Sequence, residues 1–399
     1  MSVDIRVLSE AESRPALNLF RQSLNRPSPP DAEWEYLRRS YEPGRTHGAF
    51  AGDRLVGTAL VWPSTLVVPG GRVLPLAAVT RVGVRADFRR RGVLTELMRA
   101  QLADVAARGE VFAGLHASEP VIYGRFGYGV ASLAATVTVR SRAAVVRPEA
   151  PVGGEVRLVD GDEALTLLPR LYERTRARVG MLARSRPWWP VFYDRPFGIG
   201  EHLLVAVHSG AGGDDGFLAY RPSRGDEPDA AATLGVEDFH AANPEAVNAL
   251  WRFIVGVDLV DRVKVWARPV DEPVEALFVD PRAVLGQDVR PDLWLRLVDV
   301  PTALAARSYG PGSVVVEVVD SFLPVNSGRY RVGADGVQRT GAAAELSVDV
   351  DVLAMLYLGA WRPSALAGIG LVRALDPAAV ARADTVFAVG GAAWCGTFF

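Results

Sequence analysis

Five arginines gather in one short stretch, at the point where a strand-like run gives way to a helix-like one. The segment "VRADFRRRGVLTELMRAQL" (84–102) places Arg89, Arg90 and Arg91 directly before Gly92, and the other two of the five, Arg81 and Arg85, lie a short way upstream of them. Free backbone N–H groups at a helix N-terminus, with guanidinium groups nearby, form a site for an anion. Without an anion, cations at this end of a helix oppose its dipole and cost stability. The segment is therefore either a solvated charge cluster or an anion-binding loop.

Other motifs for chemistry are missing from the sequence or incomplete. There is no Walker G-x-x-x-x-G-K-[ST] loop, and neither "GYGVAS" (127–132) nor "GIGLVRA" (368–374) completes the dinucleotide pattern G-x-G-x-x-G. The five histidines show no metal-ligand spacing among themselves or with Cys395, so we expect no metal. There is no G-x-S-x-G elbow for a nucleophilic serine, and Cys395 has no recognisable activating partner.

The composition is that of an ordinary globular chain with more than one domain. Its 399 residues are 49% hydrophobic and 23% charged, which suggests about two or three domains with real cores. A net charge of −2 argues against a dedicated nucleic-acid partner, so any anion site must be local. The N-terminus lacks the apolar region of a secretory signal, and the uncharged run 385–399 is shorter than the roughly 20 residues that span a bilayer. The single cysteine cannot form an internal disulfide, and we expect a cytoplasmic protein without a membrane span.

The elements that must position the arginine loop form a sheet layer covered by a helix. The predicted order is a hairpin (50–61), a strand (72–84), the arginine loop, an amphipathic helix from Val93, a buried strand (111–118), a glycine-broken turn (123–129) and a strand (135–140). The helix is predicted from apolar residues at i, i+3/i+4 spacing. Together these elements indicate an α+β layer.

Two further units follow a Pro/Gly-rich linker at 145–155. The second has a hairpin (202–222), a helix (246–256) and a strand (261–269), which echo the first unit without its arginine loop. The third starts near Pro291 with the strand "LWLRLVDV" and contains an Asp335-Gly336 hairpin. It ends with a helix for which Asp376 is the candidate N-cap. We interpret the second unit as a degenerate duplicate of the first.

The arginine segment carries a resemblance to a known family. "VGVRADFRRRGVLTELM" resembles motif A of the GCN5-related N-acetyltransferases (GNAT), whose R/Q-x-x-G-x-G/A loop holds the pyrophosphate of coenzyme A. Arg89, Arg90, Arg91 and Gly92 fit this motif, whereas Leu94 departs from it because the family has a small residue there. "HASEPVIYGRFGYGVAS" (116–132) resembles the enhanced intracellular survival (Eis) branch more specifically, and the "WCGTFF" ending fits the same branch.

The resemblance covers essentially the whole chain and implies an α/β (α+β) fold. It implies a GNAT acetyltransferase domain at 1–148, a degenerate GNAT-like domain at 149–290 and a sterol-carrier-protein-like α/β domain at 291–399. Members of this branch are described as hexamers that acetylate aminoglycoside amines with acetyl-CoA. The resemblance therefore implies acetyl-CoA as co-substrate, an aminoglycoside-like polyamine as the small-molecule acceptor, and a homohexamer.

Acetyl transfer to an amine needs a base for the amine, donors at the thioester oxygen and an acid for the departing thiolate. A tyrosine suits the acid role because its phenol is protonated at pH 7, and Tyr123 and Tyr128 both lie on the turn after strand 111–118. The resemblance selects Tyr123. It also implies that the base is the α-carboxylate of the last residue, Phe399, although a chain end is normally frayed.

The resemblance also assigns residues to the cofactor. The strand-end backbone that meets pantetheine corresponds to Val82, Gly83 and Val84; the phosphate loop and helix start correspond to Arg90, Arg91, Gly92, Val93, Leu94 and Thr95; and Ser118 and Glu119 end the neighbouring strand. For the acceptor pocket, segment 25–40 offers Asp31, Glu33, Trp34 and Tyr36, which could equally be surface residues of a helix.

Two other functions stay open at this point. The chain could be a non-catalytic lipid or sterol carrier built around 291–399 with a vestigial CoA-binding domain. Alternatively, the arginine loop could contact nucleic acid, which predicts salt-sensitive binding that Arg90→Ala and Arg91→Ala weaken. Release of thiol from acetyl-CoA would distinguish the enzyme from both.

Overall fold

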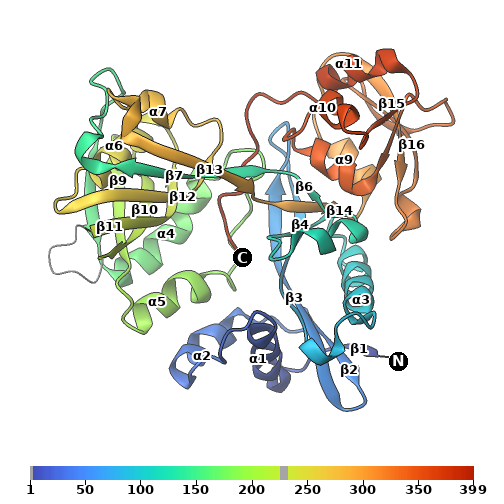
Figure 1. Ribbon diagram of the computed structural model, residues 1–399, viewed down its shortest axis with the longest axis horizontal. Helices are drawn as coiled ribbons and strands as arrows, with labels where there is room; N and C mark the ends of the chain where they lie inside the picture. The colour runs from blue at the N-terminus through green and yellow to red at the C-terminus, as the bar shows by residue number, and fades with distance from the viewer. Residues whose placement is uncertain (1–2, 225–231) are drawn as a thin grey trace.

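A computed structural model describes residues 3–224 and 232–399 of the chain, which form three mixed sheets (Figure 1). The sheet of the second unit lies on one side of the molecule, and the sheets of the first and third units lie on the other. The C-terminus lies between these two sides, in the middle of the view. Among the described residues, no helix has the length and apolar character needed to cross a membrane.

The first sheet carries the arginine loop. Its strands, in spatial order, are β1 (Asp4–Val7), β2 (Thr46–Ala51), β3 (Arg54–Val67), β4 (Val73–Val84), β5 (Phe112–Leu115), β14 (Trp294–Leu297) and β6 (Gly129–Val130). Its helices are α1 (Ser13–Ser23), α2 (Asp31–Leu37) and α3 (Val93–Ala107). Two glycines allow helices to pack closely against the strands. A Cβ on Gly57 of β3 would meet Leu97 of α3, and a Cβ on Gly83 of β4 would meet Ser23 of α1. The helix predicted from Val93 and the hairpin around Gly52 are confirmed.

Two strands lie in a different sheet from the one that the sequence predicted. Strand β14, expected in the third unit, lies between β5 and β6 in the first sheet. Strand β7 (Leu133–Arg140), expected to complete the first sheet, pairs instead with β12 and β13 in the second. Alternation of apolar residues indicates a strand and its buried face, but it does not identify the neighbouring strand. The bounds 1–148, 149–290 and 291–399 stay a prediction for how the chain divides.

The second sheet repeats the plan of the first. Its order is β13 (Val284–Pro291), β7, β12 (Val260–Pro269), β11 (Ala232–Ala241), β10 (Gly213–Ser223), β9 (Leu204–Gly210) and β8 (Glu155–Val159). The accompanying helices are α4 (Gly161–Thr175), α5 (Arg195–Gly198), α6 (Pro244–Val255) and α7 (Val274–Leu277). Parallel strands β11 and β12 are joined through α6, just as parallel β4 and β5 are joined through α3. The predicted structural duplicate is confirmed at the level of this β-α-β unit.

The third sheet is smaller and packs against four helices. Its order is β17 (Gly336–Arg339), β16 (Gly328–Gly333), β15 (Ser313–Val319), β18 (Leu346–Asp349) and β19 (Arg373–Ala374). The helices are α8 (Val300–Ala306), α9 (Val350–Tyr357), α10 (Pro363–Gly368) and α11 (Pro377–Val386). The Asp335-Gly336 hairpin is confirmed. So is the Asp376 cap, whose carboxylate accepts from Ala378 N–H.

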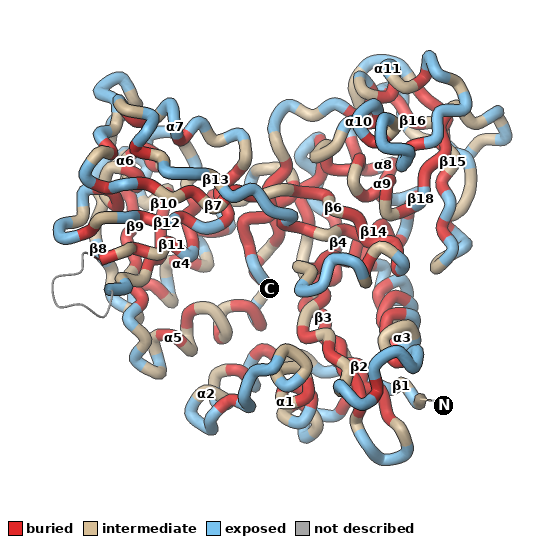
Figure 2. Tube along the Cα trace, viewed as in Figure 1, coloured by how far each residue is buried: buried red, intermediate tan, exposed pale blue. Residues whose placement is uncertain are grey.

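The final residues of the chain lie in the core rather than on the surface. Figure 2 shows the segment that leads to the C-terminus as mostly buried. Cys395 is fully buried, and Phe399 is 7% exposed within the same apolar cluster as Trp62 and Trp188. Only Phe398 in this last stretch is exposed. The frayed end that is usual for a chain terminus is therefore replaced here by a packed one.

Candidate active site

Strands β4 and β5 run side by side for only a short distance and then separate. They pair in parallel from Leu76 and Phe112 to Ala78 and Gly114. Strand β4 continues to Val84, paired only with β3 on its other side. The edge of β4 that faces β5 is therefore open from Val79 onward, with backbone groups available to a ligand that adds like a strand.

A cavity of about 430 Å³ lies at this separation. Val82 of β4, Ser118, Tyr123 and the two terminal phenylalanines line it. Its other lining residues are Leu17, Phe20, Arg21, Leu24, Arg26, Glu33, Leu37, Trp62, Val79, Thr80, Arg81, Leu115, His116, Val191, Phe192 and Arg195. The cavity thus joins the strand edge, the tyrosine turn and the chain end, which are far apart in sequence. A neighbouring cavity of about 410 Å³, lined by residues of the second unit, shares Phe192 and Phe398 with it.

The structure separates the two candidate tyrosines. Tyr123 lies between two 3₁₀ turns, Pro120–Ile122 and Gly124–Phe126, and lines the cavity. Burial raises the pKa of Tyr123 to about 12, so its phenol stays protonated at neutral pH. Tyr128 is fully buried and does not line the cavity, and its Oη has no hydrogen-bond partner in the part of the chain that the structure describes. Only Tyr123 is placed to donate a proton to a ligand in the cavity.

The chain end is held by hydrogen bonds at successive residues. Thr397 Oγ1 lies 2.8 Å from Tyr172 Oη and accepts from Arg184 Nε at 3.2 Å, and Trp188 Nε1 donates to the Phe398 carbonyl at 2.7 Å. Arg184 is itself fixed by a bidentate pair with Asp238 at 2.6 and 2.8 Å. These bonds stop at Phe398. Among the described residues, Phe399 is held by packing alone, with its ring centroid 4.8 Å from that of His116.

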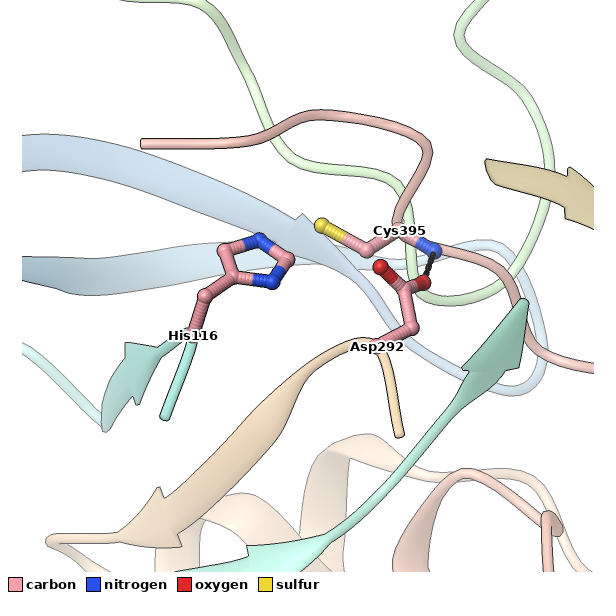
Figure 3. Close-up of side chains that lie close together, drawn as sticks. All are labelled: His116, Asp292 and Cys395. Carbon is pink, nitrogen blue, oxygen red and sulfur yellow. Dashed lines mark hydrogen bonds between the residues drawn. The ribbon is translucent and has the colours of Figure 1, made fainter. Parts of the chain in front are cut away.

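Three potential metal ligands lie beside the chain end. His116, Asp292 and Cys395 place ligand atoms within 4.8 Å of one another (Figure 3). Most of their hydrogen bonds hold the tail: Asp292 Oδ2 accepts from Cys395 N–H at 2.8 Å, and the Thr397 carbonyl accepts from His116 Nε2 and Cys395 Sγ. Asp292 Oδ2 also accepts from Ser132 Oγ at 3.0 Å. Burial raises the pKa of the Cys395 thiol, which opposes the thiolate form that a metal needs. The cluster therefore fits a tether of the chain end better than a metal site.

The arginine loop has the geometry of an anion site. Arg90 and Gly92 have φ values of 59° and 81°, and Gly92 is the N-cap of α3. A Cβ at Gly92 would meet nothing within 4 Å, so it is the left-handed backbone that favours glycine here. Asp87 is paired with Arg85 and Arg54, and the hydrogen bond from Arg85 lowers the pKa of Asp87. No carboxylate among residues 3–224 and 232–399 forms an ion pair with Arg90.

The other residues expected to bind the cofactor differ in burial and in whether they line the cavity. Val93 is buried in the core with Phe88, so only its backbone can serve a ligand, and Leu94 and Thr95 follow it in the first turn of α3. Strand β5 ends at Leu115. Ser118 and Glu119 were expected to end this strand, but they lie in the loop that follows it. Both are exposed, and only Ser118 lines the cavity.

The four acceptor candidates on α2 do not share one site. Glu33 lines the cavity, 3.4 Å from Arg21 and 3.8 Å from Arg195. Asp31 is exposed beside Arg14, and Trp34 lines a separate hollow near Tyr41. Tyr36 packs against Gly198 of α5. Their common helix placed them together in the prediction, but they face different neighbours.

Comparison with known proteins identifies the family and the domains of this chain. An acetyltransferase (GNAT) domain matches residues 4–131, a second one matches 180–297, and a sterol carrier protein domain matches 300–396. The N-acetyltransferase Eis of Mycobacterium tuberculosis is 37% identical over 362 residues, which cover 86% of this chain and 85% of that protein. This chain belongs to the Eis family of GNAT acetyltransferases.

Another N-acetyltransferase and two solved structures are similar over the whole chain. An uncharacterized N-acetyltransferase of Streptomyces coelicolor is 37% identical, covering 99% of both chains. The crystal structure of Eis1 from Mycobacterium abscessus superposes with a TM-score of 0.89 at 40% identity, covering 99% of this chain and 100% of that one. A GNAT from Anabaena variabilis shares the fold at 21% identity, with a TM-score of 0.83 and full coverage of both chains. The protein is therefore an N-acetyltransferase, with two GNAT domains followed by a domain like sterol carrier protein.

Several residues that line the cavity were not predicted from the sequence. Arg21 on α1, Trp62 on β3, His116 after β5 and Arg195 on α5 all reach it from elements without a recognisable motif. Arg81 is one of the five arginines of the opening stretch, but only the fold separates it from the loop. An arginine inside the apolar strand 72–84 is the one feature of the sequence that could have drawn attention to it.

Proposed function

We propose that this protein transfers the acetyl group of acetyl-CoA directly to an amine, with Tyr123 as the general acid and the α-carboxylate of Phe399 as the general base. The observation that carries this proposal is that both residues line one cavity, at the place where β4 and β5 separate. No acetyl-enzyme is needed, because the proposed acid and base act on the substrates themselves.

The cofactor residues follow the same geometry. Acetyl-CoA would place its pantetheine arm along the open edge of β4 and its pyrophosphate on the loop before α3. The residues proposed for this are Val82, Gly83, Val84, Arg90, Arg91, Gly92, Val93, Leu94, Thr95, Ser118 and Glu119. The left-handed backbone at Arg90 and Gly92 supports the phosphate part of the assignment, since it leaves the N–H groups at the start of α3 accessible.

The proposed reaction balances protons between the two groups. The acceptor nitrogen attacks the thioester carbonyl, and its proton passes to the Phe399 carboxylate as the C–N bond forms. The C–S bond then breaks, and the CoA thiolate takes the phenolic proton of Tyr123. Exchange with solvent returns a proton to Tyr123 and removes one from Phe399. The raised pKa of Tyr123 keeps it in the donating form between turnovers.

The acceptor and the assembly state are carried over from the Eis resemblance. An aminoglycoside-like polyamine is the acceptor class that it implies, and a homohexamer is the assembly. Sedimentation analysis tests the assembly, and a panel of amines tests the acceptor. The alternative, a lipid or sterol carrier with a vestigial CoA-binding domain, predicts no acceptor-dependent release of thiol.

The deciding experiment measures thiol release from acetyl-CoA with a panel of amines and confirms the N-acetylated product by mass spectrometry. The proposal expects turnover that depends on the acceptor and is largely lost in Tyr123→Phe. It also expects loss of turnover when Phe399 is deleted or when residues are appended after it. Full activity in either chain-end variant would refute the role of the carboxylate. A panel without turnover would refute the transferase mechanism proposed here.

A further inference from the structure

The second unit repeats the strand separation of the first, but there the chain itself bridges the two strands. Parallel strands β11 and β12 pair only over the first half of β11. Past this point Arg268 of β12 donates from Nη1 to the Phe239 carbonyl of β11 at 2.6 Å. Trp394, near the C-terminus, donates from Nε1 to the Ala267 carbonyl of β12 and places its ring 5.1 Å from that of His240 of β11. The end of the chain is therefore seated on the second unit where β11 and β12 separate.

A buried ion pair of the second unit lies beside this seat. Asp238 Oδ2 accepts from Arg184 Nη1 and from Tyr193 Oη, and Asp238 Oδ1 accepts from Arg184 Nη2. The Arg184 guanidinium also lies over two rings, 4.0 Å from the centroid of Tyr172 and 4.1 Å from that of Trp188. All of these residues are buried. The guanidinium is therefore a fixed group, because moving it would leave a buried charge unpaired.

The remaining donors of Arg184 bind the chain end. Its Nε donates to Thr397 Oγ1 at 3.2 Å, and its Nη2 makes a longer contact of 3.4 Å with the Gly396 carbonyl. The Thr397 hydroxyl in turn donates to Tyr172 Oη at 2.8 Å, since Tyr172 uses its own proton for the Leu182 carbonyl at 2.6 Å. One hydroxyl thus accepts from one residue of the second unit and donates to another.

The chain end has no secondary structure of its own. Residues 392–399 form neither a helix nor a strand, so contacts with the rest of the protein must fix their position. Thr397 is bound through both its side chain and its carbonyl, which accepts from His116 Nε2 at 2.9 Å. The terminal carboxylate lies two residues beyond Thr397, so a shift of Thr397 moves the carboxylate with it.

We propose that Thr397 is a positioning residue for the Phe399 carboxylate and that Arg184 and Tyr172 of the second unit hold it in place. This inference rests on the proposed function, in which that carboxylate is the base. We call Arg184, Tyr172 and the Thr397 hydroxyl the clamp. The clamp acts through the two residues that follow Thr397 and not by contact with the reacting atoms. It gives the second unit a task in the reaction, which is to orient the base that the third unit ends on.

The kinetic test removes the hydroxyl of Thr397 and keeps its shape. Thr397→Val should lower kcat by about 10- to 100-fold with KM for acetyl-CoA near the wild-type value, because a misplacement of about 1 Å can cost about 100-fold. Thr397→Ser keeps the hydroxyl and should retain most of kcat. Tyr172→Phe removes one of the two bonds without changing the chain end and should give a smaller loss of the same kind. Thr166→Val, at an exposed threonine of α4, is the matched control and should behave as the wild type.

A second change at the chain end separates positioning from a general structural effect. In a chain without Phe399 the proposed base is gone, so adding Thr397→Val should lower the residual rate no further. An equal further loss in both backgrounds would overturn the positioning role. Normal kcat in both Thr397→Val and Tyr172→Phe, with turnover lost on deletion of Phe399, would overturn the clamp and leave the base standing. Full activity without Phe399 would refute the base and the positioning role together.

Digestion with a carboxypeptidase tests the clamp without any turnover. The protease needs a frayed chain end, so the rate at which it releases Phe399 from the folded protein measures how often the end leaves its place. Mass spectrometry should show release about 10- to 100-fold faster in Thr397→Val than in the wild type or in Thr397→Ser, since a hydrogen bond to a charged group is lost. Release as slow as in the wild type would overturn the clamp. Faster release with unchanged kcat would overturn the positioning role, because the end would then leave its place without cost to the reaction.

Discussion

Exchanging Tyr123 for phenylalanine removes one oxygen atom and tests the proposed acid directly. Tyr123 Oη makes no hydrogen bond within the described residues, and the ring keeps its packing in the apolar cluster around Met98 and Leu115. The free energy of unfolding should therefore change by less than about 1 kcal/mol. Loss of a general acid should lower kcat by about 100- to 10,000-fold, which corresponds to about 3–5 kcal/mol in the activation barrier. KM for acetyl-CoA should stay near the wild-type value.

Tyr128 supplies the matched control for this variant. Its ring centroid lies 6.0 Å from that of Tyr123, and its buried Oη has no hydrogen-bond partner within residues 3–224 and 232–399. Tyr128→Phe should keep kcat and stabilise the protein by about 1 kcal/mol, because it removes a desolvated hydroxyl. The assays are thiol release with a saturating amine and unfolding in denaturant. Retention of more than about a tenth of kcat in Tyr123→Phe, or an equal loss in Tyr128→Phe, would refute the assignment.

The pH profile of the wild type gives a second check on Tyr123. Burial raises its pKa to about 12, so loss of the phenolic proton moves to higher pH than for an exposed tyrosine. The rate should therefore show no alkaline fall due to Tyr123 near pH 10, the ordinary pKa of tyrosine, provided the fold persists. An alkaline limb with a midpoint near pH 10 that disappears in Tyr123→Phe would contradict the buried environment described here.

Three other predictions concern the chain end, the arginine loop and the buried ion pair. Adding one residue after Phe399 moves the terminal carboxylate by about 3.5 Å and should cut kcat at least 100-fold while the melting temperature changes little, as thiol release and calorimetry would show. Arg90→Ala and Arg91→Ala should raise KM for acetyl-CoA several-fold with kcat nearly unchanged, and a fall confined to kcat would argue against a phosphate role. Asp238→Asn leaves the Arg184 charge uncompensated and should lower the free energy of unfolding by about 3–5 kcal/mol. A loss below about 1 kcal/mol on denaturant unfolding would show that the pair is solvated.

Local chemistry was predictable from the sequence where neighbours in the chain are also neighbours in space. The helix beginning at Val93 and the Asp376 cap depend on residues within one or two turns, and both are observed. The Gly92 position also follows from local backbone requirements. Each of these features depends on residues within one short segment of the chain.

Features set by distant partners could not be predicted in the same way. Nothing in the pattern of β14 distinguishes a strand of the third sheet from one that inserts beside β5. The place of Arg81 in the cavity lining is a property of the packed fold and not of the strand pattern. The chain end shows the same limit, since its apolar composition indicates burial but not that His116 and Tyr172 hold Thr397.

The insertion of β14 means that the acetyltransferase half cannot be cut out as a module. A fragment ending after residue 131 contains all of the first GNAT domain match but lacks the strand that separates β5 from β6. In the described part of the chain, strand β6 pairs with β14 alone, so the turn that carries Tyr123 would lose its anchor on one side. Strand β5 would present an unpaired edge, which is a template for aggregation. Trimming that separates β14 from the first sheet should therefore give an insoluble fragment.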